Sequence, residues 1–152
     1  QTGLLDDYPN ASAAYSLRAL NSAYTGAAIK VRRSSDNEEQ DINLLYDGSL
    51  NTDSLLAFVG AGDGFVTTWY DQSGGNNATQ GSASNQPKIV SLGSVILANG
   101  KDAIEFNGQL NLKVSSEINF QSFYQKHLSN LCTRNQSLRG MEDLASGSLE
   151  DA

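Results

Sequence analysis

The residues best suited to chemistry are concentrated in one stretch, Phe65 to Gln80, which reads FVTTWYDQSGGNNATQ. In an extended strand, alternation would place an aromatic ring on each face just before Asp71. Aromatic rings beside carboxylate and amide groups suit a sugar, because a pyranose has an apolar face and a rim of hydroxyls. A core tryptophan followed by a tight turn would give the same pattern and is the structural alternative. We predict a carbohydrate-binding surface made of Trp69, Tyr70, Asp71, Gln72, Asn76 and Asn77.

Carboxyl groups elsewhere in the chain offer a second kind of chemistry. A glycosidase needs two of them about 5 Å apart for retention or about 6.5–9.5 Å apart for inversion, and one needs a raised pKa. Asp63, Asp71, Asp102 and Glu105 would converge only if their strands are neighbours. Most of the seventeen acidic residues lie in polar turns, where a solvated position is the simpler interpretation. We therefore assign no catalytic residue.

Metal and thiol chemistry have little support. His127 is the only histidine and Cys132 the only cysteine, so neither a zinc site nor an internal disulfide is expected. Asp71 with Asn76 and Asn77 could supply oxygen ligands to calcium, although their spacing matches no EF-hand. We expect no cofactor, with calcium as the one candidate.

The composition limits the class of partner. The chain has 152 residues, the length of one domain with appendages, and a formal charge of -7 that opposes binding to nucleic acid or anionic lipid. No apolar run reaches the 18 or so residues of a membrane-spanning helix, and no secretion signal is visible in the first twenty residues. Because the chain begins with Gln1, we expect it to be processed or cut from something longer.

Hydrophobic periodicity predicts the elements that carry these residues. We expect helices over 11–24 and 52–59, a turn over 34–41, and strands over 28–33, 42–46, 65–70 and 86–90. A further pair of strands, 94–97 and 102–106, should flank the turn at Asn99-Gly100. From Ile118 the spacing becomes helical, and an acidic tail follows Gly140. We expect a β-sandwich module over 1–116 and a C-terminal helix with a tail over 117–152.

Several segments together carry a family resemblance: residues 14–42, the stretch TTWYDQSGGNNATQ, QPKIV, and GKDAIEFNG at 100–108. In this order they resemble the start of the catalytic domain of alpha-L-arabinofuranosidase B, the family 54 glycoside hydrolases. Similar stretches resemble laminin-G-like modules of bacteriophage structural proteins and of marine bacterial proteins. The resemblance covers residues 4–112. It implies an all-β, concanavalin A-like jelly-roll sandwich, with short helices near the N-terminus and an appended C-terminal helix.

The resemblance also implies what the chain lacks. The family's nucleophile and acid/base residues belong to the half of the domain after the matched region, and this chain departs from the pattern near Leu112. The family has a pair of cysteines around the strand that leads into YDQSG, and Val59 and Gly64 stand at those positions here. The implied disulfide is therefore absent.

We consequently expect a non-catalytic, lectin-like module of a phage or other particle, presenting a glycan-binding or subunit-interaction surface. Its partners would be glycans or neighbouring structural subunits in an oligomer, located on a virion or an extracellular surface. Two alternatives stay open. One is the N-terminal portion of an alpha-L-arabinofuranosidase, and the other is a purely architectural capsid or tail decoration protein.

Overall fold

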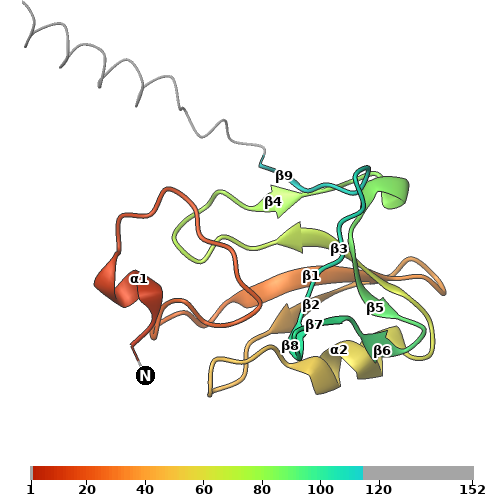
Figure 1. Ribbon diagram of the computed structural model, residues 1–152, viewed down its shortest axis with the longest axis horizontal. Helices are drawn as coiled ribbons and strands as arrows, with labels where there is room; N and C mark the ends of the chain where they lie inside the picture. Colours follow the sequence, from red (N-terminus) through yellow and green to blue (C-terminus); the bar gives the residue numbers. More distant parts are fainter. Residues whose placement is uncertain (1, 115–152) are drawn as a thin grey trace, which may run out of the picture. The chain divides into compact units, whose positions relative to one another are not determined.

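The computed structural model describes residues 2–114, and strands dominate them (Figure 1). The helices are α1 (Leu4–Asp7), α2 (Thr52–Val59) and the 3-10 turn η1 (Ala83–Asn85). The strands are β1 (Ala27–Arg33), β2 (Glu39–Asn43), β3 (Gly64–Trp69), β4 (Ala78–Thr79), β5 (Lys88–Ser91), β6 (Ser94–Val95), β7 (Leu97–Ala98), β8 (Lys101–Asp102) and β9 (Lys113–Val114). The prediction of an all-β fold with short helices near the N-terminus is confirmed.

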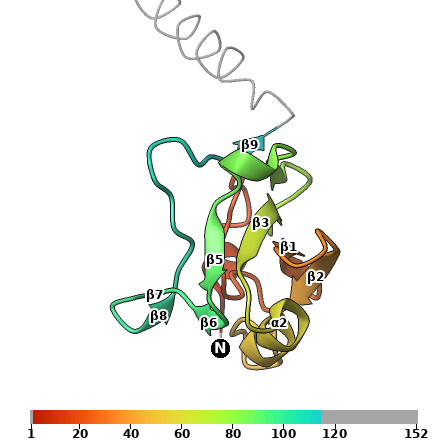
Figure 2. The same cartoon turned by 90° about the vertical axis from the view of Figure 1, so that its right-hand side faces the viewer.

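Strand β3 is central to the seven-stranded sheet that these residues form. Five strands follow the order β2-β1-β3-β4-β9, β5 also pairs with β3, and β6 pairs with β5. One edge of β3 pairs with β1, and the other edge is shared between two partners. Gly64 and Phe65 pair with β5, whereas Thr68 and Trp69 pair with β4. Figure 2 shows β5, β3, β1 and β2 next to one another. Residues at the two ends of β3 are thus held by different parts of the chain.

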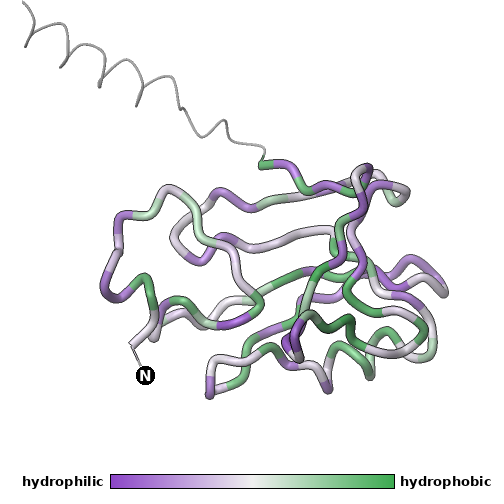
Figure 3. Tube along the Cα trace, in the orientation of Figure 1, coloured by the Kyte–Doolittle hydropathy of each residue, from purple (hydrophilic) through white to green (hydrophobic). Residues whose placement is uncertain are grey.

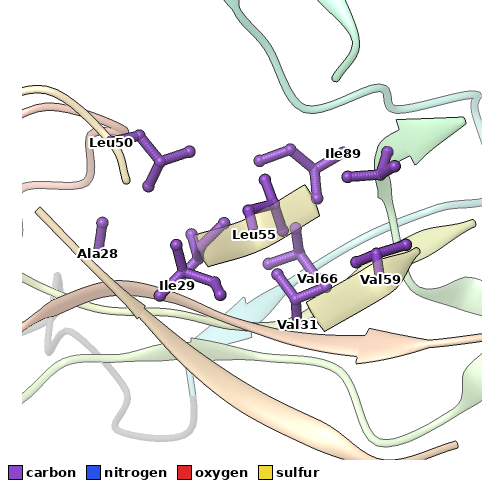
Figure 4. Packing of buried hydrophobic residues seen from close by; sticks show 10 residues of the cluster. Ala28, Ile29, Val31, Leu50, Leu55, Val59, Val66 and Ile89 are labelled. Atoms are coloured by element: carbon purple, nitrogen blue, oxygen red, sulfur yellow. The ribbon is translucent and has the colours of Figure 1, made fainter. Parts of the chain in front are cut away.

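The core lies on the face of this sheet that α2 covers. Ile29 and Val31 of β1 and Val66 of β3 are fully buried, and Leu55 and Val59 of α2 pack with them (Figure 4). The other members of the cluster are Ala28, Ile42, Leu50, Ile89 and Val90. Figure 3 shows hydrophobic stretches along β1 and α2. Removing this apolar surface from water supplies most of the stabilisation, at about 25 cal/mol per Å² buried.

Helix α2 begins and ends where its sequence predicts. The Asn51 side chain accepts a hydrogen bond from the Ser54 N–H at 3.0 Å, which caps the first turn. Gly60 ends the helix with a φ of 68°, a conformation that glycine adopts without a Cβ penalty, and its N–H donates to the Leu56 carbonyl. The predicted helix over 52–59 is confirmed.

The helix predicted over 11–24 is wrong. This segment has no regular secondary structure, and among the described residues the one helix before it is the single turn α1. Its backbone groups bond to distant parts of the chain instead of to one another: the N–H groups of Ala14 and Leu20 donate to side chains that follow β3, and that of Ala19 donates to the Gly48 carbonyl. Such bonds take the place of the i to i−4 ladder that a helix needs.

Two strand predictions need correction in their limits. Strand β2 starts at Glu39 and ends at Asn43, earlier than predicted, because its polar residues alternate outward while Ile42 is buried against β1. The Asn99-Gly100 turn is confirmed, with φ of 50° and 73°, but it joins only the short strands β7 and β8. Ser94 and Val95 pair with β5 and not with residues 102–106.

A polar network fastens the last described segment to the sheet. The Arg32 Nε donates to the Gln86 side chain at 2.7 Å, and Gln86 donates to the Gln80 carbonyl at 2.9 Å. Gln80 in turn donates to the Asn111 carbonyl at 3.1 Å. Because Gln80 and Gln86 are buried, these bonds satisfy amides that would otherwise destabilise the fold.

The predicted C-terminal helix and acidic tail over 117–152, with His127 and Cys132, lie outside the described residues. The described part belongs to one compact unit, Gln1–Ser116. Within residues 2–114, no helix has both the length and the apolar character needed to cross a membrane.

Close packing at the start of β3 gives a first prediction. A Cβ added to Gly64 would lie 2.9 Å from Cγ2 of Val59 and 3.2 Å from atoms of both Val31 and Val90. We expect Gly64→Ala to lower the free energy of unfolding by about 1–3 kcal/mol, because the core must shift to admit the methyl group. Urea unfolding measures this. Gly81→Ala is the matched control, since no atom lies within 4 Å of its added Cβ; equal effects of the two substitutions would contradict the prediction.

Candidate functional site

Asp71 is the centre of the corner that follows β3. Its side chain is buried, with 3% exposure, and both carboxylate oxygens accept hydrogen bonds. Oδ1 accepts from the Ala14 N–H at 2.8 Å and from the N–H and hydroxyl of Ser73 at 2.9 and 2.7 Å. Oδ2 accepts from the Asn76 N–H at 3.1 Å. The carboxylate therefore closes its own turn and holds a segment 57 residues earlier in the chain.

The hydrogen bonds decide the charge of this group. Burial acts to raise the pKa of Asp71, but the bonds from Ser73, Ala14 and Asn76 act in the opposite direction, and the net result is a pKa below the ordinary value. The side chain is thus ionised at neutral pH. A general acid of a glycosidase needs the opposite shift, so Asp71 is suited to holding structure and not to donating a proton.

Gln72 binds the same N-terminal segment at three points. Its Oε1 accepts from the Leu20 N–H at 2.8 Å, and its Nε2 donates to the carbonyls of Ser16 and Arg18 at 3.2 and 2.8 Å. The Gln72 N–H also donates to the Ala14 carbonyl at 2.8 Å. A buried glutamine amide has two donors and one acceptor oxygen, and here each of them is used.

An aromatic pair covers one side of the corner. The Tyr15 and Trp69 rings lie 5.9 Å apart at an angle of 50°, and the Tyr15 hydroxyl donates to the Asn76 carbonyl. The Asn76 side chain donates to the Ser12 carbonyl at 2.8 Å. Burial raises the pKa of Tyr15. Within residues 2–114, Trp69 Nε1 is the one buried side-chain nitrogen or oxygen without a hydrogen-bond partner.

The remaining predicted contacts are also engaged. The Tyr70 hydroxyl donates to Asp41 at 2.7 Å. Burial is the larger cause of a raised pKa for Tyr70, and this hydrogen bond is the second. The Asn77 side chain accepts from the Asp71 N–H at 3.0 Å. The six predicted residues therefore lie at one corner of the sheet. Many of their hydrogen bonds are made to other residues of the same chain. Their contact with a sugar stays a prediction.

Sequence reasoning missed the partners of this corner. Tyr15 and the backbone of 14–20 were assigned to a helix, and no spacing in the sequence links them to Asp71 more than fifty residues later. Only the tertiary structure reveals that an irregular segment completes the site.

Asp63 and Glu105 lie away from Asp71, and Asp102 belongs to β8, in the separate two-stranded sheet. Asp63 precedes β3 and Asp71 follows it, so their backbones are roughly 20 Å or more apart at about 3.3 Å per residue. Asp63 accepts from the Leu92 N–H and from Lys88, both at 2.9 Å, and these bonds lower its pKa. Glu105 is exposed, and its backbone pairs with Lys88 on the Asp63 side. Asp63 and Asp71 thus lie too far apart to form the acid pair of a glycosidase.

The part of the chain that the structure describes contains no cluster of side chains of the kind that usually binds a metal ion. No three histidine, cysteine, aspartate or glutamate side chains there are grouped to hold an ion. Calcium binding by Asp71, Asn76 and Asn77 remains a prediction.

Comparison with known proteins places the chain in a family. The family model described as "Alpha-L-arabinofuranosidase B, catalytic" matches residues 6–151. An alpha-L-arabinofuranosidase of Hypocrea jecorina is 41% identical over 73 residues, which are 47% of this chain and 15% of that protein. The chain belongs to the family of alpha-L-arabinofuranosidase B catalytic domains.

Solved structures agree with this. A GH54 a-l-arabinofuranosidase soaked with a cyclic sulfate inhibitor, and a mutant soaked with 4-nitrophenyl a-l-arabinofuranoside, each match with 27% identity and a TM-score of 0.52. Each match covers 58% of this chain and 22% of the solved one. The predicted jelly-roll type of β-sandwich is confirmed, and the chain spans less than a quarter of the relatives it matches.

These comparisons correct three expectations. The main prediction of a non-catalytic module from a phage or other particle is wrong, because the family model and the relatives are arabinofuranosidases. The virion and lectin-like assignments have no support. The expected departure from the family near Leu112 is also wrong, since the match continues to residue 151.

Val59 and Gly64, at which the resemblance implies a cysteine pair in the family, lie close together, since a Cβ added to Gly64 would lie 2.9 Å from Cγ2 of Val59. The correspondence with the family's cysteines stays a prediction.

The charge of Asp71 gives a prediction for pH dependence. Its pKa is lower in the folded chain than the ordinary value of about 3.9. Its contribution to stability is therefore present above about pH 4 and is lost as the pH falls through the lowered folded pKa. At neutral pH we expect Asp71→Asn to lower the free energy of unfolding by about 2 kcal/mol, and the difference from wild type should shrink in acid.

Denaturant unfolding from pH 7 down to strongly acidic conditions measures this difference. Glu105→Gln is the matched control, because the Glu105 side chain is exposed and makes no hydrogen bond or ion pair within the described residues. A gap between Asp71→Asn and wild type that stays constant with pH would show that the carboxylate charge is not what holds the corner.

Gln72 allows a local test of the same corner. Gln72→Ala removes the side-chain partners of the Leu20 N–H and of the Ser16 and Arg18 carbonyls. We expect faster amide hydrogen exchange at Leu20 and faster proteolysis within 12–20, while the amides of β1 stay protected. Uniform loss of protection across the sheet would instead indicate global destabilisation and refute a local role.

Proposed function

We propose that this chain forms the leading part of an α-L-arabinofuranosidase catalytic domain, and that the whole protein hydrolyses arabinofuranosyl bonds. The observation that carries the proposal is the family match over residues 6–151. The activity is taken from relatives that are named arabinofuranosidases, of which this chain spans only a part.

The role of the described residues in this proposal is to support the site. Every carboxyl group among residues 2–114 whose pKa is shifted has a lowered pKa: Asp6, Asp36, Asp47, Asp63 and Asp71. A glycosidase acid needs a raised one. The proposal therefore makes neither Asp63 nor Asp71 the general acid, and assigns to the corner at Asp71 the task of fixing the segment 14–20 on the sheet.

Fixed geometry matters for this reaction. Reacting groups must be held near the productive position, and small displacements are costly in rate. The corner fixes its segment with a buried, charged carboxylate and a fully bonded amide, which are strong and directional contacts.

Four of the six predicted residues are partly exposed and would contact a sugar at the corner: Trp69, Tyr70, Asn76 and Asn77. The side chains of Asp71 and Gln72 are buried and use their hydrogen bonds within the chain. A glycan is the proposed partner and the extracellular surface the proposed location. Assembly into an oligomer stays a prediction.

A chimera tests this function directly. Residues of this chain would replace the matching segment of the Hypocrea jecorina relative, and release of 4-nitrophenol from 4-nitrophenyl α-L-arabinofuranoside would be measured. We expect the chimera to hydrolyse the substrate, whereas the relative with the segment deleted should not. The chimera carrying Asp71→Asn should unfold at a lower temperature, because the corner loses its carboxylate.

The outcome that contradicts the proposal is a chimera that melts cooperatively yet releases no 4-nitrophenol. A chimera that does not fold would be replaced by one that exchanges only residues 64–80, where the corner and β3 are contained. Hydrolysis by that smaller chimera would support the proposal, and a folded but inactive one would refute it.

A further inference from the structure

Asparagine is followed directly by glycine twice in the chain, at Asn99-Gly100 and at Asn107-Gly108. In such a pair the glycine nitrogen can attack the side-chain amide of the asparagine, because glycine has no Cβ to obstruct a close approach of its backbone. Both reacting groups belong to the chain, so the reaction needs no ligand and no docking partner. The backbone that holds each pair decides how readily the two groups meet.

The first pair is held in a paired hairpin turn. Asn99 and Gly100 have φ of 50° and 73°, the positive values that a type I′ turn requires. Strand β7 pairs with β8 around this turn, and the Ala103 N–H extends the hairpin by donating to the Ile96 carbonyl at 2.8 Å. Ring closure needs rotation about the Cα–C bond of Asn99. This rotation would break the turn that joins the two strands.

The second pair lies in a short turn whose hydrogen bonds are all local. The Asn107 carbonyl accepts from the N–H groups of Gln109 and Leu110, the latter at 3.3 Å. The Gly108 N–H makes no hydrogen bond within the described residues. The turn belongs to the connection between β8 and β9, which Figure 2 shows as a long loop, and residues 103–112 contain no strand. No pairing of strands therefore holds Asn107 in place.

The connection is fastened to the sheet on both sides of this turn. Glu105 exchanges two backbone hydrogen bonds with Lys88, at 2.8 and 3.3 Å. The Asn111 N–H donates to the Asn85 carbonyl at 2.9 Å, and the Asn111 carbonyl accepts from Gln80 at 3.1 Å. The turn between these points can open while the sheet stays intact. Opening a turn of this kind costs less free energy than opening a paired hairpin.

We propose that Asn107 is the preferred site of spontaneous deamidation in this chain, and that the paired hairpin protects Asn99. The Gly108 nitrogen loses its proton and attacks Cγ of Asn107, which forms a new N–C bond. The Cγ–Nδ2 bond breaks, and the amide nitrogen leaves as ammonia with that proton. Water then opens the cyclic imide at either carbonyl and gives aspartate or isoaspartate. The reaction consumes no oxidant or reductant, and the proposal is independent of the proposed function.

The product changes the chain at a defined place. Both products add a carboxylate at position 107, and isoaspartate also lengthens the main chain between Glu105 and Asn111 by a methylene group. The fastening at Asn111 should loosen as a result. We expect the Asn111 amide to exchange hydrogen faster in aged than in fresh protein, while the amides of β1 stay protected.

Peptide mapping of the full chain tests the proposal. Trypsin separates the two pairs, because cleavage after lysine yields the peptides 89–101 and 102–113. The folded chain is aged in mildly alkaline buffer, and mass spectrometry with isoaspartyl methyltransferase labelling follows each peptide. We expect deamidation at Asn107 to be roughly 3- to 10-fold faster than at Asn99. In urea, where both turns are lost, the two rates should become nearly equal.

Three variants separate the effects of the two turns. Ala98→Pro removes a backbone donor from the hairpin, and it should raise the rate at Asn99 while the rate at Asn107 stays unchanged. Gly108→Ala should slow deamidation at Asn107, because the added methyl group hinders the attack. Gly100→Ala is the matched control: both glycines have positive φ and no atom within 4 Å of an added Cβ, but Gly100→Ala should leave the rate at Asn107 unchanged.

Circular dichroism of each variant checks that the fold is intact. Equal rates at Asn107 and Asn99 in the folded wild-type chain, or a faster reaction at Asn99, would overturn the proposal. A ratio of rates that is the same in urea as in the folded chain would also overturn it, because the difference would then come from the neighbouring residues and not from the fold.

Discussion

The buried carboxylate of Asp71 is the interaction on which this part of the domain depends. A charge removed from water must be compensated, and Asp71 obtains its partners from its own turn and from the Ala14 backbone. Because one of these partners, the Ala14 N–H, comes from a distant segment, the full set of bonds forms only when the chain is folded. The need of the buried carboxylate for hydrogen-bond partners therefore fixes the position of segment 14–20. The Gln72 side chain adds three further bonds to this segment.

Strand β3 connects this corner to the rest of the sheet. Its start packs tightly, with Gly64 against the core, and its end passes directly into the corner. The second edge of β3 pairs with β5 near its start and with β4 near its end. Between these two partners lie the buried side chains of Gln80 and Gln86. There the Gln86 side chain accepts from Arg32 and donates to the Gln80 backbone carbonyl, while the Gln80 side chain donates to the Asn111 carbonyl. The polar groups of this sheet are thus used to join segments, and the apolar ones to form the core beneath α2.

Family membership gives these features a functional context. The relatives are arabinofuranosidases, and the chain spans less than a quarter of their length. Lowered pKa values at Asp63 and Asp71 favour a supporting role for these two carboxylates. A rigid sheet with a fixed N-terminal segment provides such support.

Local sequence determined the features that depend on neighbouring residues. Alternation fixed β1 and β3, capping by Asn51 and the Gly60 stop fixed α2, and Asn99-Gly100 fixed a hairpin turn, because each follows from short-range backbone preferences. The family was likewise recognisable from YDQSG and the segments around it. Only the tertiary structure decided that residues 11–24 form no helix, since their apolar spacing is outweighed by hydrogen bonds to Asp71, Gln72 and Gly48. Bonds between residues fifty positions apart leave no periodic trace in a sequence, and they define this site.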